Sequence, residues 1–281
     1  MSKLSLAHYA RNLKLLERNR EWWQAGSVTP AEKAAYYGSL VRTYAKRDKV
    51  IRYLGNDLHF DNPATPLNLQ NYPYEITRKV LRNMAMTPTT VLDIGANLGQ
   101  FSLTTRHVLG AGVAIDAFEP NPFVFDFLRR NTQGVDGVTI HNYGVGAEDG
   151  ESEIHFDPSR TGIGSIIKAN AGDPTESAVI RITGDVAAVT GRSEYDLVKV
   201  DVEGYEFHTL EGLAAISPRY LFLEVSGLGR EKDYRHSELF ARIRQQWGEF
   251  DLSYIGAYGD RGDTFDILVE FARTGASPSA G

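Results

Sequence analysis

The stretch that most constrains the fold runs from Val91 to Phe101 and reads VLDIGANLGQF. Apolar residues lead into Asp93, small residues follow, and an amphipathic run begins at Phe101. This pattern predicts a buried strand, a tight glycine turn and the start of a helix. We expect Gly95 and Gly99 to let the backbone approach a ligand with no Cβ in the way. The turn would lie at the carboxyl end of a strand, where open α/β sheets bind ligands.

Strands and helices are predicted to alternate from residue 90 onward, which indicates βαβ units and a doubly wound, mostly parallel sheet. Val179–Thr183 is interpreted as an edge strand, and the last two strands as an antiparallel pair that closes the sheet. The expected strands are 91–94, 113–119, 138–143, 153–156, 179–183, 195–202, 219–225, 252–257 and 264–271. After the helix that begins at Phe101, further helices are expected over 123–131, 207–213 and 238–247.

The order of residues in the first turn indicates the kind of ligand. A dinucleotide-binding turn reads G-x-G-x-x-G, whereas this chain reads D-x-G-x-x-x-G, with Asn97 in place of the second glycine. An acid before the turn suits a ligand with a cationic centre and no pyrophosphate, such as S-adenosylmethionine (SAM). Glu119 follows Asp93 by 26 residues at the end of the next predicted strand, where an acid can accept two hydrogen bonds from a ribose diol. The alternatives are a tight turn without a ligand and, for Glu119, a charge at a helix N-terminus.

A second acidic stretch, KVDVEGYE, runs from Lys199 to Glu206 after another buried strand. We expect Asp201 to point into the crevice where the strand order changes direction. The alternative is that Lys199, Glu203 and Glu206 form surface ion pairs. That role is expected for Glu206 and stays open for Glu203.

Together these motifs resemble those of the FkbM family of SAM-dependent methyltransferases. The matching segments are DIGANLG at 93–99, AFEPNP at 117–122, KVDVEGYE at 199–206 with LEG at 210–212, and the acid Glu224 that closes a later strand. The resemblance covers residues 74–225 well and 226–272 loosely. It implies a Rossmann-like class I methyltransferase fold with a seven-stranded sheet, and methyl transfer, usually to a hydroxyl.

The resemblance also implies which residues hold SAM and its product S-adenosylhomocysteine (SAH). The expected set is Asp93, Gly95, Ala96, Asn97, Gly99, Phe101, Glu119, Pro120, Asn142, Gly144 and Asp201. The chain departs from the family pattern at 142–146, which reads NYGVG, and at Gly184, which precedes Asp185.

A hydroxyl group is a poor nucleophile at neutral pH, so a positioned base is expected to assist the transfer. Asp201 is the first candidate for that base, with Glu224 on the neighbouring strand end and His208 as a weaker alternative for which a helix-surface role is favoured. Paired acids would instead suit Mg²⁺, which prefers oxygen ligands. The direct base is slightly favoured over the metal.

Composition adds limits on the compartment and the class of protein. The chain has 281 residues and no cysteine, which excludes disulfides and thiolate metal sites. The sequence contains no apolar run of about 18 residues, so no membrane span is expected, and we expect a cytoplasmic protein that does not bind nucleic acid.

The expected domains are a helical extension over residues 1–73, a methyltransferase domain over 74–273 and a disordered tail over 274–281. Helical spacing covers 3–24, a second helix starts at Thr29-Pro30, and residues 50–54 and 58–60 are expected to form a short hairpin. Residues 1–88 carry 14 Lys and Arg against 7 Asp and Glu, a net charge of +7, whereas the whole chain carries −6. Solvated helix faces explain this asymmetry best. We expect the N-terminal helices to cover the pocket or to form a homodimer contact.

The favoured function is O-methylation of a hydroxyl on a sugar, a glycan or a secondary metabolite. Two alternatives remain open: a nicotinamide-dependent oxidoreductase on a similar sheet, and a catalytically silent SAM-binding protein that recruits a partner. The acceptor itself is not specified by any motif.

Overall fold

The structure is a computed structural model, and it describes residues 28–46, 49–60, 73–158, 164–167, 174–225, 236–258 and 264–272. The helix predicted over 3–24 and the predicted tail at 274–281 lie outside the described residues. None of the helices in the described part of the chain is long and apolar enough to cross a membrane.

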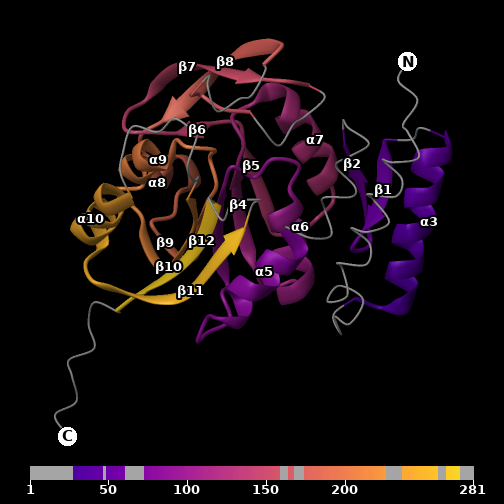
Figure 1. The fold of residues 1–281 in the computed structure, drawn as a ribbon, viewed down its shortest axis with the longest axis horizontal. Helices are drawn as coiled ribbons and strands as arrows, with labels where there is room; N and C mark the ends of the chain where they lie inside the picture. The colour runs from indigo at the N-terminus through magenta and orange to yellow at the C-terminus, as the bar shows by residue number, and fades with distance from the viewer. Residues whose placement is uncertain are drawn as a thin grey trace, which may run out of the picture.

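A seven-stranded sheet forms the centre of the molecule (Figure 1). Its strands are β3 (Thr90–Ile94), β4 (Ala114–Phe118), β5 (Val138–His141), β9 (Glu194–Val200), β10 (Ser217–Val225), β11 (Phe250–Tyr258) and β12 (Thr264–Phe271), in the order β11-β12-β10-β9-β3-β4-β5. Strand β12 is antiparallel to both of its neighbours, and the other pairs are parallel. The predicted doubly wound, mostly parallel sheet of class I methyltransferases is confirmed.

The chain reverses its direction of winding between β3 and β9. From β3 it proceeds outward to β4 and β5, and it then returns to place β9 on the other side of β3. Asp93 pairs in register with Lys199, and Ile94 with Val200. The turn after β3 and the acidic stretch after β9 therefore emerge side by side at the carboxyl end of the sheet.

Helices cover both faces of this sheet, because alternate residues of its strands point to opposite sides. Leu92 and Ile94 pack with α8 (Val186–Thr190), α9 (Glu206–Gly212) and α10 (His236–Trp247). Val91 packs on the opposite face with α5 (Pro73–Arg82) and α6 (Gln100–Leu109). Figure 1 shows α7 (Pro122–Thr132) on the same side as α6.

A smaller sheet is inserted between β5 and β9. It contains β6 (Gly144–Val145), β7 (Gly150–Phe156) and β8 (Glu176–Thr183), in the order β6-β8-β7. The prediction that Val179–Thr183 is an edge strand is wrong, since β8 pairs with a strand on each side. Four apolar side chains that the insertion itself supplies, at Ile154, Phe156, Ile180 and Ile182, form its core.

The N-terminal described segment starts at a capped helix, α3 (Pro30–Lys46). The Thr29 hydroxyl accepts a hydrogen bond from the Glu32 N–H at 3.2 Å, and the Glu32 carboxylate accepts one from the Thr29 N–H at 2.8 Å. This reciprocal pair is a capping box, and the predicted helix start is confirmed.

The hairpin after α3 consists of β1 (Val50–Tyr53) and β2 (Asn56–His59), which form their own two-stranded sheet. Its turn residues are Leu54 and Gly55, both with positive φ, as a two-residue primed turn requires. The hairpin packs on Leu98, Leu103 and Val124, and the Asn131 side chain of α7 exchanges two hydrogen bonds with the backbone of His59. In Figure 1, α3, β1 and β2 lie together beside α6 and α7.

Tyr53 offers a test of how firmly the hairpin is joined to the rest of the fold. Its buried hydroxyl lies 2.8 Å from Thr104 Oγ1. Thr104 Oγ1 donates its own hydrogen to Gln100 O, so the Tyr53 hydroxyl is the donor. We predict that Tyr53→Phe lowers the free energy of unfolding by about 1 kcal/mol, and that Thr104→Val costs more because it leaves the Tyr53 hydroxyl buried without an acceptor. Urea denaturation of both variants and the double variant measures this, and strictly additive costs would contradict the contact.

Candidate active site

Two loops form the floor of the site, and their backbones touch. The turn after β3 contains Gly95, and the acidic loop after β9 begins at Asp201. The Asp201 N–H donates to Ile94 O at 3.1 Å. A Cβ added to Gly95 would lie 1.8 Å from Asp201 O, and Gly95 has a φ of +77°. Only glycine therefore satisfies both the conformation and the close approach of the two loops.

This geometry adds a packing role to the two glycines. The space that the missing Cβ of Gly95 leaves is occupied by the Asp201 backbone, and a Cβ on Gly99 would lie 2.9 Å from Leu128 Cδ1 of α7. Gly95 is thus required by a backbone contact, and Gly99 by its φ of +88° together with the Leu128 side chain. A bulky substitution at Gly95 would accordingly disturb the fold as well as any ligand.

Lys199 contacts both the turn after β3 and the acidic loop after β9. Its ammonium group donates to Gly95 O at 2.8 Å, lies 3.1 Å from Asp93 Oδ1 and lies 3.5 Å from Asp201 Oδ2. Burial by itself would lower the pKa of Lys199, but the attraction of Asp93 and Asp201 outweighs it and holds the pKa above its ordinary value. Lys199 is therefore charged at neutral pH. It is buried, so a surface ion pair is not its role.

The prediction that Glu206 lies on the surface is wrong. Its side chain is fully buried, and its carboxylate accepts a hydrogen bond from the Gly204 N–H at 2.9 Å. The preceding residues Glu203 and Gly204 both have positive φ, so the chain turns sharply here before α9. Glu206 stabilises that turn from inside, whereas Glu203 is half-buried.

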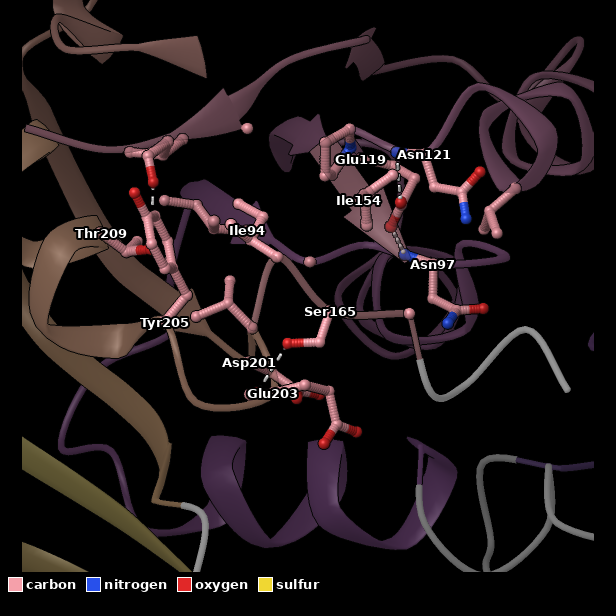
Figure 2. Close-up of a pocket in the computed structure, with 18 of the residues that line it drawn as sticks. Ile94, Asn97, Glu119, Asn121, Ile154, Ser165, Asp201, Glu203, Tyr205 and Thr209 are labelled. Atoms are coloured by element: carbon pink, nitrogen blue, oxygen red, sulfur yellow. Dashed lines mark hydrogen bonds between the residues drawn. The ribbon is translucent and has the colours of Figure 1, made fainter. Parts of the chain in front are cut away.

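Glu119 lies at the end of β4 and is 7% exposed. One carboxylate oxygen accepts the Asn97 N–H at 3.0 Å and the other accepts the Asn121 N–H at 2.9 Å, as Figure 2 shows. Burial raises the pKa of Glu119 to about 7, although the two N–H groups and Lys199 oppose that rise. The carboxyl group thus links the first turn to the start of α7, and it titrates near neutral pH.

A pocket opens between these loops and the inserted sheet (Figure 2). The residues that line it come from the first turn, the end of β4, the insertion, the acidic loop and the helices α7 and α9. They are Ile94, Gly95, Asn97, Glu119, Pro120, Asn121, Val124, Tyr143, Gly144, Val145, Ile154, Gly164, Ser165, Ile166, Asp201, Val202, Glu203, Tyr205 and Thr209.

Six of the expected site residues line this pocket: Gly95, Asn97, Glu119, Pro120, Gly144 and Asp201. The other expected residues are not part of its lining: Asp93, Ala96, Gly99, Phe101, Asn142, Glu224 and His208.

Several of the residues outside the lining have identifiable contacts. Phe101 stacks on Phe222, and its ring centre is 5.7 Å from Lys199 Nζ. Asn142 Nδ2 donates to the carbonyl oxygens of Glu119 and Pro120. These residues shape the wall from outside.

His208 lies on α9 next to Glu211, with its Nδ1 3.5 Å from Glu211 Oε2 and its ring 4.8 Å from that of Tyr205. It does not line the pocket. This placement agrees with the helix-surface role that the sequence favoured for it.

The sequence did not single out Asn121, Tyr143, Ser165 or Tyr205 as pocket residues. Asn121 directly follows Glu119-Pro120, and this position in the EPNP motif was a usable signal. Ser165 reaches the site only because the insertion folds back, where its hydroxyl donates to Glu203 O at 3.2 Å. A contact between residues so distant in the chain has no local sequence pattern.

Three carboxylates form the best candidate for a metal site in the described part of the chain. Asp201, Glu203 and Glu224 place one oxygen each within 4.8 Å of the others. Oxygen ligands of this kind suit Mg²⁺. The Lys199 ammonium group, 3.5 Å from Asp201 Oδ2, already supplies one positive charge at that point.

The fold and the pocket at the carboxyl ends of the strands define a class I methyltransferase architecture. The profile of the family described as the methyltransferase FkbM domain matches residues 93–250, more than half of the chain. The protein belongs to the FkbM methyltransferase family.

Curated relatives include the hexuronic acid methyltransferase AglP of Haloferax volcanii, 30% identical over 153 residues that cover 52% of this chain and 60% of that protein. The 31-O-demethyl-FK506 methyltransferase FkbM of Streptomyces tacrolimicus is 30% identical over 155 residues, covering 44% of this chain and 58% of that protein. Methyltransferase 1 of Beauveria bassiana is 27% identical over 177 residues, covering 55% and 71%. The matches thus span between 58% and 71% of these relatives.

Among solved structures, the methyltransferase FkbM from Methylobacillus flagellatus KT aligns with a TM-score of 0.49 at 16% identity, over 94% of this chain and 60% of that one.

The raised pKa of Glu119 predicts a pH-dependent stability. The ordinary glutamate pKa is near 4.5, and the folded protein raises it to about 7. The folded state therefore holds this proton more tightly, so its stabilising effect is complete below about pH 4.5 and is lost as the pH rises through 7. Between these limits, the free energy of unfolding of the wild type should fall relative to Glu119→Gln by on the order of 3 kcal/mol. Denaturant unfolding at stepped pH measures the slope, and a pH-independent difference would contradict it.

Proposed function

We propose that this protein transfers a methyl group from SAM to a hydroxyl group of a sugar, a glycan or another small molecule. The observation that carries the proposal is the placement of two strand-end acids, Glu119 and Asp201, in the wall of one pocket. Membership of the FkbM methyltransferase family supports the transfer of a methyl group.

The pocket residues fit SAM in chemical terms. Each Glu119 oxygen accepts one backbone N–H and keeps a further lone pair for a ribose hydroxyl. Pro120, Tyr143 and Gly144 would flank the adenine, and the Gly95–Asn97 backbone would hold the methionine part. When bound, SAM supplies an electrophilic methyl group on a sulfonium centre.

Asp201 is the proposed base. The Asp201 carboxylate would accept the proton of the acceptor hydroxyl as that oxygen takes the methyl group and the carbon–sulfur bond breaks. Lys199, 3.5 Å from Asp201 Oδ2, fixes the position of that carboxylate. Alignment of donor and acceptor matters as much as the base, because displacement requires the reacting atoms at about 3–3.5 Å. Glu224 is a second acid close to Asp201, and His208, which does not line the pocket, takes no part in the proton transfer.

A metal-assisted version uses the same residues differently. The observation that favours it is the third carboxylate, Glu203, beside Asp201 and Glu224. Mg²⁺ held there would orient and acidify an acceptor hydroxyl. We favour the direct base, because the Lys199 ammonium group already lies next to Asp201.

The class of acceptor is inferred from the relatives. Two of them are a hexuronic acid methyltransferase and a 31-O-demethyl-FK506 methyltransferase. The first acts on a sugar acid, which has hydroxyl as well as carboxyl oxygens, and the second is named for a substrate that lacks a methyl group on an oxygen. An oxygen acceptor on a sugar or another small molecule agrees with both.

We further propose that residues 1–73 are an extension of a methyltransferase domain that spans 74–273. In the described part of this extension, α3, β1 and β2 pack beside α6 and α7 and add no strand to the seven-stranded sheet. A homodimer contact through the N-terminal helices would be detected as a doubled mass in light scattering.

The chemical step is tested with Asp201→Asn. We predict that this variant binds SAM with less than twofold change and loses turnover by about 10²- to 10⁴-fold, measured as methyl transfer from labelled SAM to a panel of hexoses and hexuronic acids. Asp251→Asn makes the same chemical change at an exposed position of β11 and should keep wild-type turnover.

Chelation separates the two versions of the step. A direct base predicts that EDTA leaves turnover unchanged, whereas a metal site predicts loss with EDTA and recovery with added Mg²⁺. Full activity of Asp201→Asn would exclude both roles for this residue.

A further inference from the structure

Asn121 has a side chain whose orientation is fixed by the helix that follows it. It is the N-cap of α7, and its Oδ1 accepts the Phe123 N–H at 3.0 Å. A backbone N–H needs an acceptor, so the oxygen of the amide must face the helix. The amide nitrogen, Nδ2, is thereby directed away from the cap.

Asn121 Nδ2 is a buried donor for which the described residues supply no acceptor. Asn121 is 2% exposed, and Nδ2 has no hydrogen-bond acceptor in the residues that the structure describes. Buried polar groups are rarely left in this state, because the lost hydration is not replaced. Asn121 also lines the pocket, where Figure 2 shows it next to Glu119. An acceptor supplied by a ligand would satisfy the group.

The neighbouring carboxylate indicates which ligand group that is. The Asn121 N–H and the Asn97 N–H each occupy one lone pair of Glu119. A diol can still donate both of its hydrogens to the remaining lone pairs. Once both hydroxyls have donated, their oxygens can only accept, and they need a nearby donor. Asn121 Nδ2 is a buried donor on the residue whose backbone already bonds Glu119.

We propose that the Asn121 side-chain amide donates a hydrogen bond to a ribose hydroxyl of SAM, so that Glu119 and Asn121 together recognise the diol. This inference rests on the proposed function. It makes Asn121 a residue that distinguishes the ribose from its deoxy forms, and it ties cofactor binding to the N-terminus of α7.

The test replaces the donor while keeping the cap. Serine and aspartate cap helices about as well as asparagine. Ionised aspartate has no proton to donate, and the serine hydroxyl ends one bond short of the amide nitrogen, so it does not reach the same acceptor while it caps the helix. We measure the affinity of the full chain for SAH and for its 2′-deoxy and 3′-deoxy analogues by calorimetry at pH 8, with the wild type, Asn121→Ser and Asn121→Asp. Asp185→Asn is the matched control, because Asp185 caps α8 through the Ala188 N–H and lies outside the pocket lining.

Both Asn121 variants should bind SAH about tenfold more weakly than the wild type, with thermal unfolding close to that of the control. For one of the two deoxy analogues the same substitutions should change the affinity less than twofold, because the accepting hydroxyl is already absent. If Asn121→Ser does not fold, Asn121→Asp carries the comparison.

Wild-type affinity for SAH in both variants would overturn the inference, and so would an equal loss for SAH and both analogues, since the contact would then lie elsewhere on the ligand. In each case the wild type still binds SAH and the proposed function stands. A wild type that does not bind SAH would instead overturn the proposed function, and this inference with it.

Discussion

The buried Lys199 ammonium group is the interaction on which the site depends. It contacts Gly95 O, Asp93 and Asp201 at once, so it joins the two loops that leave β3 and β9. The parallel register of Asp93 with Lys199 brings these groups together. Removing the ammonium group would leave two carboxylates close together in a buried site, which is strongly unfavourable. The cation therefore stabilises the side-by-side placement of both loops at the end of the sheet.

Glu119 makes the second connection, at the other end of the same pocket. Its carboxylate holds the backbone of Asn97 on one side and of Asn121 on the other. Burial raises its pKa to about 7, so its charged and neutral forms are about equally populated at pH 7 before a ligand donates hydrogen bonds to it. In the free protein the charged Glu119 carboxylate is therefore destabilised by burial. Two hydrogen bonds from a diol would stabilise that charged form. The inserted sheet closes the pocket from above through residues such as Ile154 and Ser165.

Much of the fold could be predicted from the sequence because the relevant signals are local. Apolar strands, the capping box at Thr29 and the acids at strand ends are each contained within a few residues. The predictions for Val179–Thr183 and Glu206 failed for a common reason. An edge strand differs from a central strand only in how many strands pair with it. A buried acid differs from a surface acid only in the groups that surround it in the fold, which its neighbours in the sequence do not specify. The roles of Gly95 and Gly99 required the same kind of information, because Asp201 and Leu128 fill the space beside them.

A crystal structure of the protein with SAH tests the central claim most directly. The account predicts that the ribose diol lies on Glu119, that the adenine lies beside Pro120 and Tyr143, and that the homocysteine lies over Gly95–Asn97 and faces Asp201. SAH bound away from this pocket, or with its ribose turned away from Glu119, would contradict the account.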